Sequence, residues 1–168
     1  MKPLGLLVFL FACGEKSTGD TGSDLDTERA ADLWQAIDGY ESWGTVEGWE
    51  GLVESVDGTH GDFVQIWGNE VALTALAGDA AIPDGGIFVK RGYADAKAAP
   101  LSDQETVTVM QKIDGFDSEN GDWFWASFYT ATGDVAGVAG TSSSCSGCHS
   151  VDPDGDFVWF DDLEIPSR

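Results

Sequence analysis

The sequence predicts an α+β domain, built mainly on an antiparallel sheet with helices flanking it. Three observations carry this prediction: strand-like runs are joined by turn signals, one stretch of helical spacing precedes them, and a second interrupts them. The chain has 168 residues, 42 % of them hydrophobic, with 7 Trp and 9 Phe. A chain of this length and composition forms one domain with a substantial core.

Two segments are expected to be helical. In residues 27–41, apolar side chains recur three or four positions apart, and Thr27 followed by Glu28 is typical of a helix start. Residues 69–77 form the second, shorter segment. There the side chain of Asn69 can cap the first turn, and Gly78 suits the C-terminal end. We therefore expect one helix before the strands and one between them.

Strand-like runs make up most of the rest of the chain. The clearest is the run in which Thr and Val alternate. We predict strands at residues 62–68, 87–92, 105–113, 122–129 and, as a short closing piece, 156–160. Turns are expected at 83–86 and 115–121. Residues 43–61 and 93–102 are expected to be irregular, and 133–144 a loop of small residues.

The net charge is strongly negative, because 8 basic and 30 acidic residues give −22 at pH 7. Nucleic-acid binding depends on clustered Lys and Arg that neutralise phosphates, and anionic membranes are bound through basic patches. The composition therefore excludes a general nucleic-acid binder, and it argues against docking on lipid through a basic surface. The same negative field could orient a basic redox partner protein.

The first residues have the pattern of a targeting signal. Lys2 precedes an apolar run at residues 4–12, which is shorter than the ~20 residues that a membrane-spanning helix needs. The run ends at Cys13 and Gly14, as in a bacterial lipobox, where cleavage before the cysteine leaves that residue to carry lipid. An ordinary signal peptide followed by an unrelated cysteine is the alternative.

We therefore expect a signal peptide at residues 1–12, a lipidated flexible tether at 13–24, and the folded domain at 25–168. This arrangement places the protein on the outer face of a bacterial membrane, as a periplasmic or outer-membrane lipoprotein. Its contact with the membrane is then only the lipid on Cys13.

Residues 145–149 read C-S-G-C-H, the C-x-x-C-H pattern of c-type haem attachment. The thiols of Cys145 and Cys148 would bond covalently to the two vinyl groups of one haem, and His149 would ligate the iron as the proximal base. This attachment takes place outside the cytoplasm, in agreement with the secretion signal. A Cys145–Cys148 disulfide and a zinc site are the alternatives. Zinc is disfavoured because His60 is the only other histidine.

The opposite side of the iron has no evident ligand in the sequence. Electron-transfer cytochromes c place Met or His there. After signal removal the only methionine is Met110, inside the Thr/Val strand, and His60 lies in a Gly-flanked turn. Core packing accounts for Met110, and a surface turn accounts for His60. We therefore expect an open iron that binds small molecules.

A series of short motifs, taken in this order, resembles the cytochrome P-460 family, which includes the cytochromes c′-beta. The motifs are residues 60–67 with Asn69, 82–90, 107–110, 115–117, 121–124, 145–149 and 156–159. Each motif is short, but their order, with a single C-x-x-C-H near the C-terminus, is specific. The resemblance covers residues 55–160.

The resemblance implies a mainly antiparallel β domain with flanking helices, a homodimer, and one high-spin haem c with an open distal face. In the enzymes of the family a lysine is also bonded to the haem, and hydroxylamine is oxidised with nitric oxide chemistry. Lys90 matches that lysine. In the c′-beta branch this bond is absent, apolar aromatic residues cap the iron, and the protein binds nitric oxide. By the same resemblance, Phe63 and Phe88 are expected to contact the haem.

Strand alternation gives Lys90 and Phe88 one face of their strand and their odd-numbered neighbours the other. If Phe88 points toward the haem, so does Lys90, whereas a solvated Lys90 is the alternative. The family enzymes also carry a distal carboxylate on the strand matched by residues 105–113, where only Glu105 could reach the haem. Glu105 is therefore the one candidate for the general base of hydroxylamine oxidation.

Taken together, these observations predict an extracytoplasmic c-type haem protein whose open iron binds or acts on small nitrogen compounds, nitric oxide or hydroxylamine. They leave open whether the protein is a hydroxylamine-oxidising oxidoreductase or a gas-binding protein. A single-haem electron-transfer cytochrome c, with Met110 or His60 as the sixth ligand, is the alternative.

Overall fold

The computed structural model describes residues 24–55, 58–150 and 156–158. The predicted signal peptide, Cys13 and the tether up to residue 23 lie outside these ranges, as does the end of the predicted strand at 156–160. Within the described ranges, no helix combines the length and the apolarity that crossing a membrane requires.

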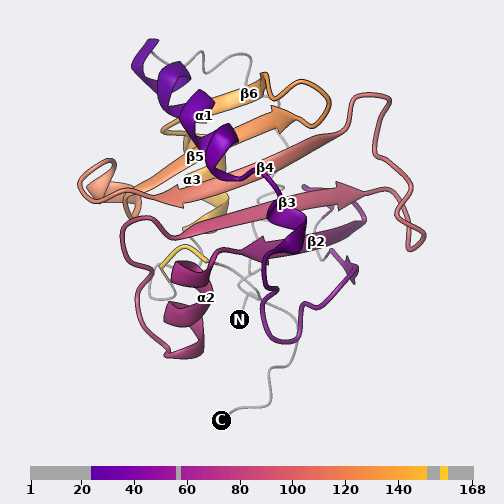
Figure 1. Ribbon diagram of the computed structural model, residues 1–168, viewed down its shortest axis with the longest axis horizontal. Coiled ribbons are helices and arrows are strands. Elements are labelled where there is room, and N and C mark those ends of the chain that lie inside the picture. Colours follow the sequence, from indigo (N-terminus) through magenta and orange to yellow (C-terminus); the bar gives the residue numbers. More distant parts are fainter. Residues whose placement is uncertain (1–23, 56–57, 151–155, 159–168) are drawn as a thin grey trace, which may run out of the picture.

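The described residues form one six-stranded antiparallel sheet, in which each strand pairs with its neighbours in the sequence (Figure 1). The strands are β1 (Val53–Glu54), β2 (Phe63–Gly68), β3 (Ile87–Tyr93), β4 (Thr106–Lys112), β5 (Trp123–Tyr129) and β6 (Val135–Gly140). Short connections suffice for such a sheet, because antiparallel neighbours need no long crossover. The predicted α+β class is confirmed, together with the four main strands.

Three α-helices are described: α1 (Asp24–Ala36), α2 (Glu70–Ala77) and α3 (Ser143–His149). Two short 3₁₀ turns, η1 (Tyr40–Ser42) and η2 (Ser118–Asn120), accompany them. The predicted cap of α2 is confirmed, since the Asn69 side chain accepts a hydrogen bond from the backbone N–H of Ala72 at 2.9 Å. It also accepts one from the N–H of Ile87 at 3.1 Å, so the cap ties α2 to β3.

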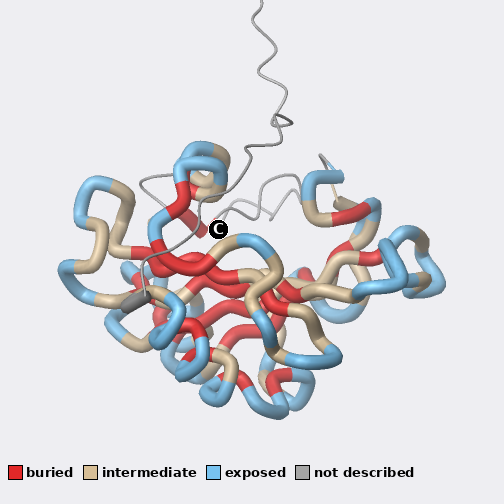
Figure 2. The backbone as a smooth tube through the Cα atoms, turned by 90° about the horizontal axis from the view of Figure 1, so that it is seen from above, coloured by how far each residue is buried: buried red, intermediate tan, exposed pale blue. Residues whose placement is uncertain are grey.

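Each face of the sheet has its own core, because side chains of a strand alternate between the faces. In Figure 1, α1 crosses in front of the sheet and α3 lies behind it. The α1 face consists of Trp67, Ile87, Val89, Val107, Val109, Phe124, Ala126 and Phe128, packed against Ala30, Leu33 and Ile37 of α1. The α3 face includes Val64, Ile66, Phe88, Met110, Trp123 and Trp125. Figure 2 shows the buried residues gathered along the strands.

The first helix differs from the prediction at both ends. It begins at Asp24, three residues before the predicted start, and ends at Ala36. Gly39 follows with a φ of 70°. A left-handed residue cannot continue a right-handed helix, and glycine adopts this conformation without a Cβ penalty. Ile37 and Tyr40 continue the apolar spacing beyond Ala36 because both side chains are buried, although the helix itself has ended.

The prediction of a loop at residues 133–144 is wrong. Val135–Gly140 form β6, which pairs with β5, and α3 begins at Ser143. Gly and Ala have weak strand preference, so pairing with β5, rather than local propensity, makes this strand. The C-x-x-C-H motif therefore lies in a helix, and the predicted haem loop at this position is corrected to α3.

The predicted closing strand is also wrong in its described part. Asp156 and Phe157 form a turn with φ of 60° and 62°. Left-handed backbone does not fit the extended geometry of a strand. The described residues of 43–55 and 58–61 are irregular as predicted, except that β1 pairs with β2.

Candidate functional site

Helix α3 carries the two cysteines and the histidine of the C-x-x-C-H motif. Cys145, Cys148 and His149 stand at positions i, i+3 and i+4 of the helix, and this spacing places them on one face. The Ser142 side chain caps the helix by accepting a hydrogen bond from the N–H of Cys145 at 3.4 Å. Cys145 packs against the cluster on the α3 face of the sheet. The helix therefore directs both thiols and the imidazole to the same side.

The ring of His149 is held in one tautomer. Its Nδ1 lies 2.8 Å from the carbonyl oxygen of Phe157. A carbonyl oxygen can only accept, so Nδ1 is the protonated nitrogen and donates this hydrogen bond. The lone pair of the neutral imidazole is then on Nε2. Histidines that bind a metal almost always donate their other N–H in this way, so the structure prepares His149 as a ligand through Nε2.

The α3 face of the sheet forms an apolar floor beside His149. The ring of Trp125 lies 4.8 Å from the His149 ring, at an interplanar angle of 55°. Across the sheet Trp125 pairs with Met110, and Met110 pairs with Phe88. All three side chains are buried. The floor is therefore a continuous row of large apolar side chains.

These residues fit haem, which combines a large apolar macrocycle with carboxylate side groups. The buried Nε1–H of Trp125 has no hydrogen-bond partner among the described residues. A buried donor left without a partner is costly, so such a donor in a functional site calls for an acceptor. The row of apolar side chains suits the macrocycle, and a carboxylate group suits the indole donor. Cys145, Cys148 and His149 would supply the covalent and axial bonds.

The second histidine lies close to the first. The ring centres of His60 and His149 are 6.5 Å apart, with an interplanar angle of 72°. Gly92 of β3 explains how the loop that carries His60 comes so near the sheet, because a Cβ at Gly92 would overlap the carbonyl group of His60. The structure thus brings together two imidazoles that are 89 positions apart in the sequence.

Lys90 and Phe88 occupy the α3 face, in agreement with the alternation predicted from the sequence. Phe88 is buried in the cluster of that face. Lys90 is half-buried two residues further along β3, between Ile66 of β2 and Thr108 of β4. The amine is therefore carried by the same face of the sheet as Trp125 and helix α3.

Two predicted site residues belong to the other face. Phe63 pairs with Tyr93 at the end of β2, in register with the residues of the α1 face. The carboxylate of Glu105 binds the guanidinium of Arg91, with Oε2 and Nη2 2.7 Å apart. Burial would lower the pKa of Arg91, but the hydrogen bond from Arg91 to Glu105, together with the electrostatic effects of Tyr93, Glu105 and Tyr40, outweighs burial and raises that pKa. The structure therefore does not bring Phe63 or Glu105 to the α3 face.

The structure also bears on the two alternative assignments of the C-x-x-C-H motif, a disulfide and a zinc site. Cys145 takes part in no disulfide, so the structure does not contain the Cys145–Cys148 bridge. In the part of the chain that the structure describes, no group of three or more His, Cys, Asp or Glu is placed to hold a metal ion.

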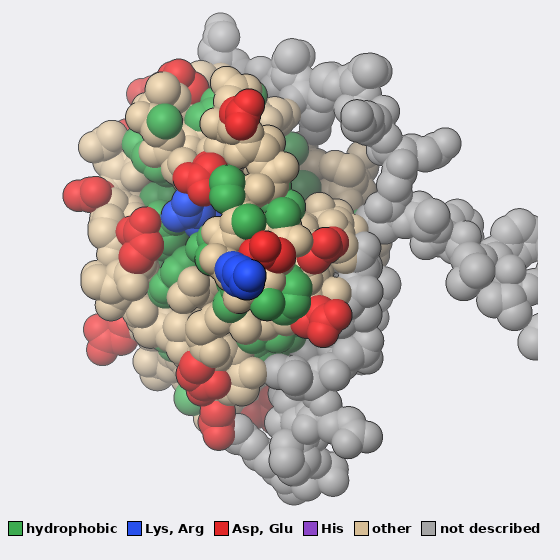
Figure 3. Space-filling model, turned by 90° about the vertical axis from the view of Figure 1, so that its right-hand side faces the viewer, with side chains coloured by type: hydrophobic (Ala, Val, Ile, Leu, Met, Phe, Trp, Pro, Cys, Tyr) green, Lys and Arg blue, Asp and Glu red, His purple; other side chains and the backbone are tan. Residues whose placement is uncertain are grey.

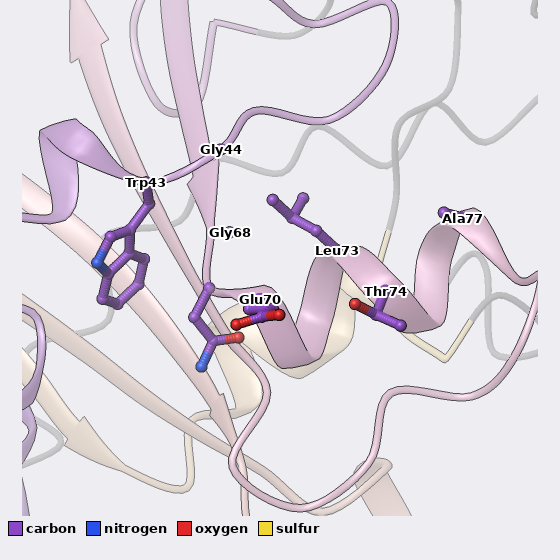
Figure 4. Close-up of a pocket in the computed structure, with 8 residues that line it drawn as sticks. Trp43, Gly44, Gly68, Glu70, Leu73, Thr74 and Ala77 are labelled. Atoms are coloured by element: carbon purple, nitrogen blue, oxygen red, sulfur yellow. The ribbon is translucent and has the colours of Figure 1, made fainter.

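A separate pocket of about 610 Å³ opens beside α2 (Figure 4). Its lining consists of Trp43, Gly44, Gly68, Asn69, Glu70, Leu73, Thr74 and Ala77. None of the residues predicted to bind haem lines it. Helix α3 with its motif, Phe88 and Lys90 lies on the α3 face of the sheet instead.

Sequence reasoning missed Trp125 and the carbonyl group of Phe157. Trp125 belongs to a strand that is apolar on both faces, so no alternation distinguished it from the core residues around it. Backbone carbonyl groups leave no signal in the residue types. The sequence offers His60 as a candidate ligand, but its position next to His149 is a product of the folded chain.

Comparison with known protein families gives a match that covers most of the chain. The family model described as cytochrome P460 covers residues 37–160. The matched range contains β1 to β6, α2 and α3, including Cys145, Cys148 and His149. No curated protein matches the chain.

Proposed function

The chain belongs to the cytochrome P460 family and is therefore a c-type haem protein, and we propose that it binds small nitrogen compounds, nitric oxide above all, on the side of the iron opposite His149. The observation that carries the proposal is the hydrogen bond from Nδ1 of His149 to Phe157, which leaves Nε2 as the ligand atom on a helix face shared with both cysteines.

Haem held by these residues would supply an iron that can change oxidation state and bind a small ligand. Cys145 and Cys148 would each form a thioether, and His149 would hold the iron from one side. Phe88, Met110 and Trp125 would exclude water from the macrocycle, because their side chains already form a buried apolar row.

The position of Glu105, the candidate general base, favours binding of nitric oxide over oxidation of hydroxylamine. Oxidising hydroxylamine releases protons along with electrons, and a positioned general base assists such a step. Glu105 was the candidate base, and its carboxylate is bound to Arg91 on the α1 face. A haem protein without this base would be expected to bind nitric oxide more readily than it would turn over hydroxylamine.

Electron transfer is the second candidate function, and the position of His60 favours it. Imidazole nitrogen binds a metal at about 2.0–2.1 Å, so two imidazoles on opposite sides of one metal ion have ring centres about 6 Å apart. The observed separation of His60 and His149 is 6.5 Å. With both rings on the iron, the protein would pass electrons to a partner. The acidic side chains dispersed over its surface would suit a basic partner (Figure 3).

Spectra of the ferric protein separate the two functions. We expect the wild-type protein to be high-spin at neutral pH and to bind nitric oxide with an affinity that His60→Ala leaves within about twofold, the difference expected when no ligand bond is lost. The measurement is an optical titration with nitric oxide, with Met110→Leu as the matched control. A low-spin wild-type spectrum that becomes high-spin in His60→Ala but not in Met110→Leu would instead establish the electron carrier.

Lys90 is proposed to contact the haem, as the matching lysine of the family enzymes does. Its amine is a nucleophile only when neutral, and burial beside an apolar group favours the neutral form. We expect Lys90→Ala to change the absorption spectrum of the reduced protein, whereas Lys97→Ala, in an exposed loop, should not. Peptide mass spectrometry then shows whether the haem peptide is joined to the peptide of Lys90. Unchanged spectra and unchanged nitric oxide affinity in Lys90→Ala would show that this lysine is solvated.

We also propose that the protein is anchored to the outer face of a bacterial membrane through lipid on Cys13. Acyl chains contribute about 0.8 kcal/mol of membrane affinity for each buried CH₂ group. Cys13→Ser is therefore expected to move the protein from the membrane to the soluble fraction. Recovery of the wild-type protein in the soluble fraction alone would contradict the anchor.

A further inference from the structure

Asp156 binds three separate parts of the fold beside the haem site. Its carboxylate forms a salt bridge with Lys112 of β4 and accepts a hydrogen bond from the backbone N–H of Ile82 at 2.8 Å. Its carbonyl oxygen accepts a hydrogen bond from Nε1 of Trp123 at 2.8 Å. These partners are 33 to 74 positions away in the sequence. The position of Asp156 is therefore set by the sheet and by the chain that enters β3.

The ion pair between Lys112 and Asp156 is shielded from solvent. The two side chains keep 11 % and 16 % of their accessible surface. The ammonium group of Lys112 also lies 5.0 Å from the centre of the Trp123 ring, within the range of a cation–π contact. A pair of charges in such surroundings is little screened, so either charge alone would be unfavourable there.

The backbone at this point is strained. Asp156 and Phe157 have φ of 60° and 62°, in the left-handed region that residues other than glycine rarely adopt. Two consecutive non-glycine residues with positive φ persist only when contacts with the surrounding structure hold them in that conformation. The contacts of Asp156 supply that restraint, and the buried ring of Phe157 adds packing. The turn then directs the carbonyl group of Phe157 to His149, at 2.8 Å.

We propose that Lys112 and Asp156 are positioning residues for the proximal histidine: their ion pair holds the strained turn whose carbonyl group orients His149 and makes it a stronger electron donor. This inference rests on the proposed function in one respect, that His149 ligates the iron. Outer-shell partners of this kind fix the ring and raise the basicity of the ligand. A more basic ligand stabilises the ferric iron, so the ion pair lowers the reduction potential.

The test uses the haem-loaded protein and compares Asp156→Ala with Asp84→Ala. Asp84 is a matched control, because its carboxylate also accepts a backbone hydrogen bond, from Asp114 at 3.0 Å, but in the turn before β3. We expect Asp156→Ala to shift the ferric-to-ferrous equilibrium about tenfold toward the ferrous state, which is about 59 mV for one electron. The iron–histidine stretch in resonance Raman spectra of the ferrous protein should move to lower frequency.

Changes at Lys112 test the same idea from the other side of the ion pair. Lys112→Met keeps the side-chain stem against Trp123 but removes the charge, and it should shift the potential and the stretch in the same direction. Lys112→Arg keeps the charge and should restore wild-type values. If Asp156→Ala does not load haem, Asp156→Asn and Lys112→Met decide the question.

Two results distinguish failure of this inference from failure of the proposed function. If His149→Ala retains the iron–histidine stretch, His149 is not the ligand and the proposed function fails. If the stretch requires His149 but neither it nor the potential responds to Asp156→Ala, Asp156→Asn or Lys112→Met, only the positioning role is overturned.

Discussion

Replacing both Cys145 and Cys148 by alanine is expected to abolish covalent haem attachment. Each thiol would form one thioether, and no other residue of the motif can form such a bond. Helix α3 itself should survive, because its cap is Ser142 and alanine favours helices. The measurement is the intact mass of the purified chain, together with haem staining after denaturing electrophoresis.

The single variants are the controls for this experiment. Cys145→Ala and Cys148→Ala should each retain haem through the remaining thioether, with an altered spectrum. Complete loss in both single variants would mean that neither bond forms alone. Covalent haem in the double variant would contradict the thioether assignment, and adding Lys90→Ala would show whether the lysine holds it.

Trp123→Ala is expected to lower the free energy of unfolding by about 3–5 kcal/mol, the cost usual for a large aromatic side chain in a core. Trp123 has no exposed surface and is among the largest fully buried side chains of the described residues. It packs near Phe88 and Trp125, with ring centres 6.4 Å away in each case. Its loss would also remove the hydrogen bond to Asp156. Urea unfolding of the haem-loaded protein gives the value.

Two companion variants separate packing from hydrogen bonding. Trp123→Phe keeps most of the apolar volume but leaves the carbonyl oxygen of Asp156 without its donor, which costs about 1–3 kcal/mol. Val71→Ala removes an exposed side chain of α2 and should change stability by less than about 0.5 kcal/mol. A Trp123→Ala protein as stable as Val71→Ala would show that the α3 face does not depend on this core.

Predictions that depended on short-range pattern succeeded. The alternation that grouped Lys90 with Phe88 is correct because the period of a strand is fixed by its own backbone. The cap at Asn69 is correct because a capping side chain reaches only the next few residues. The resemblance to the cytochrome P460 family is confirmed by the family match over residues 37–160.

Features that depend on strand pairing were not evident from the sequence. Phe63 lies on the opposite face from Phe88 because the β2–β3 register places it beside Tyr93, and a shift of one residue exchanges the faces. β6 forms from a segment rich in Gly and Ala, which have little strand preference, because the edge of β5 offers hydrogen bonds to it. Neither the face on which Phe63 lies nor the formation of β6 can be predicted from the sequence of a single segment.

The sequence by itself determined the α+β class, the resemblance to the cytochrome P460 family, and the side of β3 that Lys90 shares with Phe88. Only the tertiary structure decided which residues surround the motif. It placed His60 beside His149, bound Glu105 to Arg91 and set the turn at Asp156 against Lys112, 44 positions away. The physical reason is range: residue types fix contacts within a few positions, whereas these contacts join distant segments and exist only once the sheet has formed.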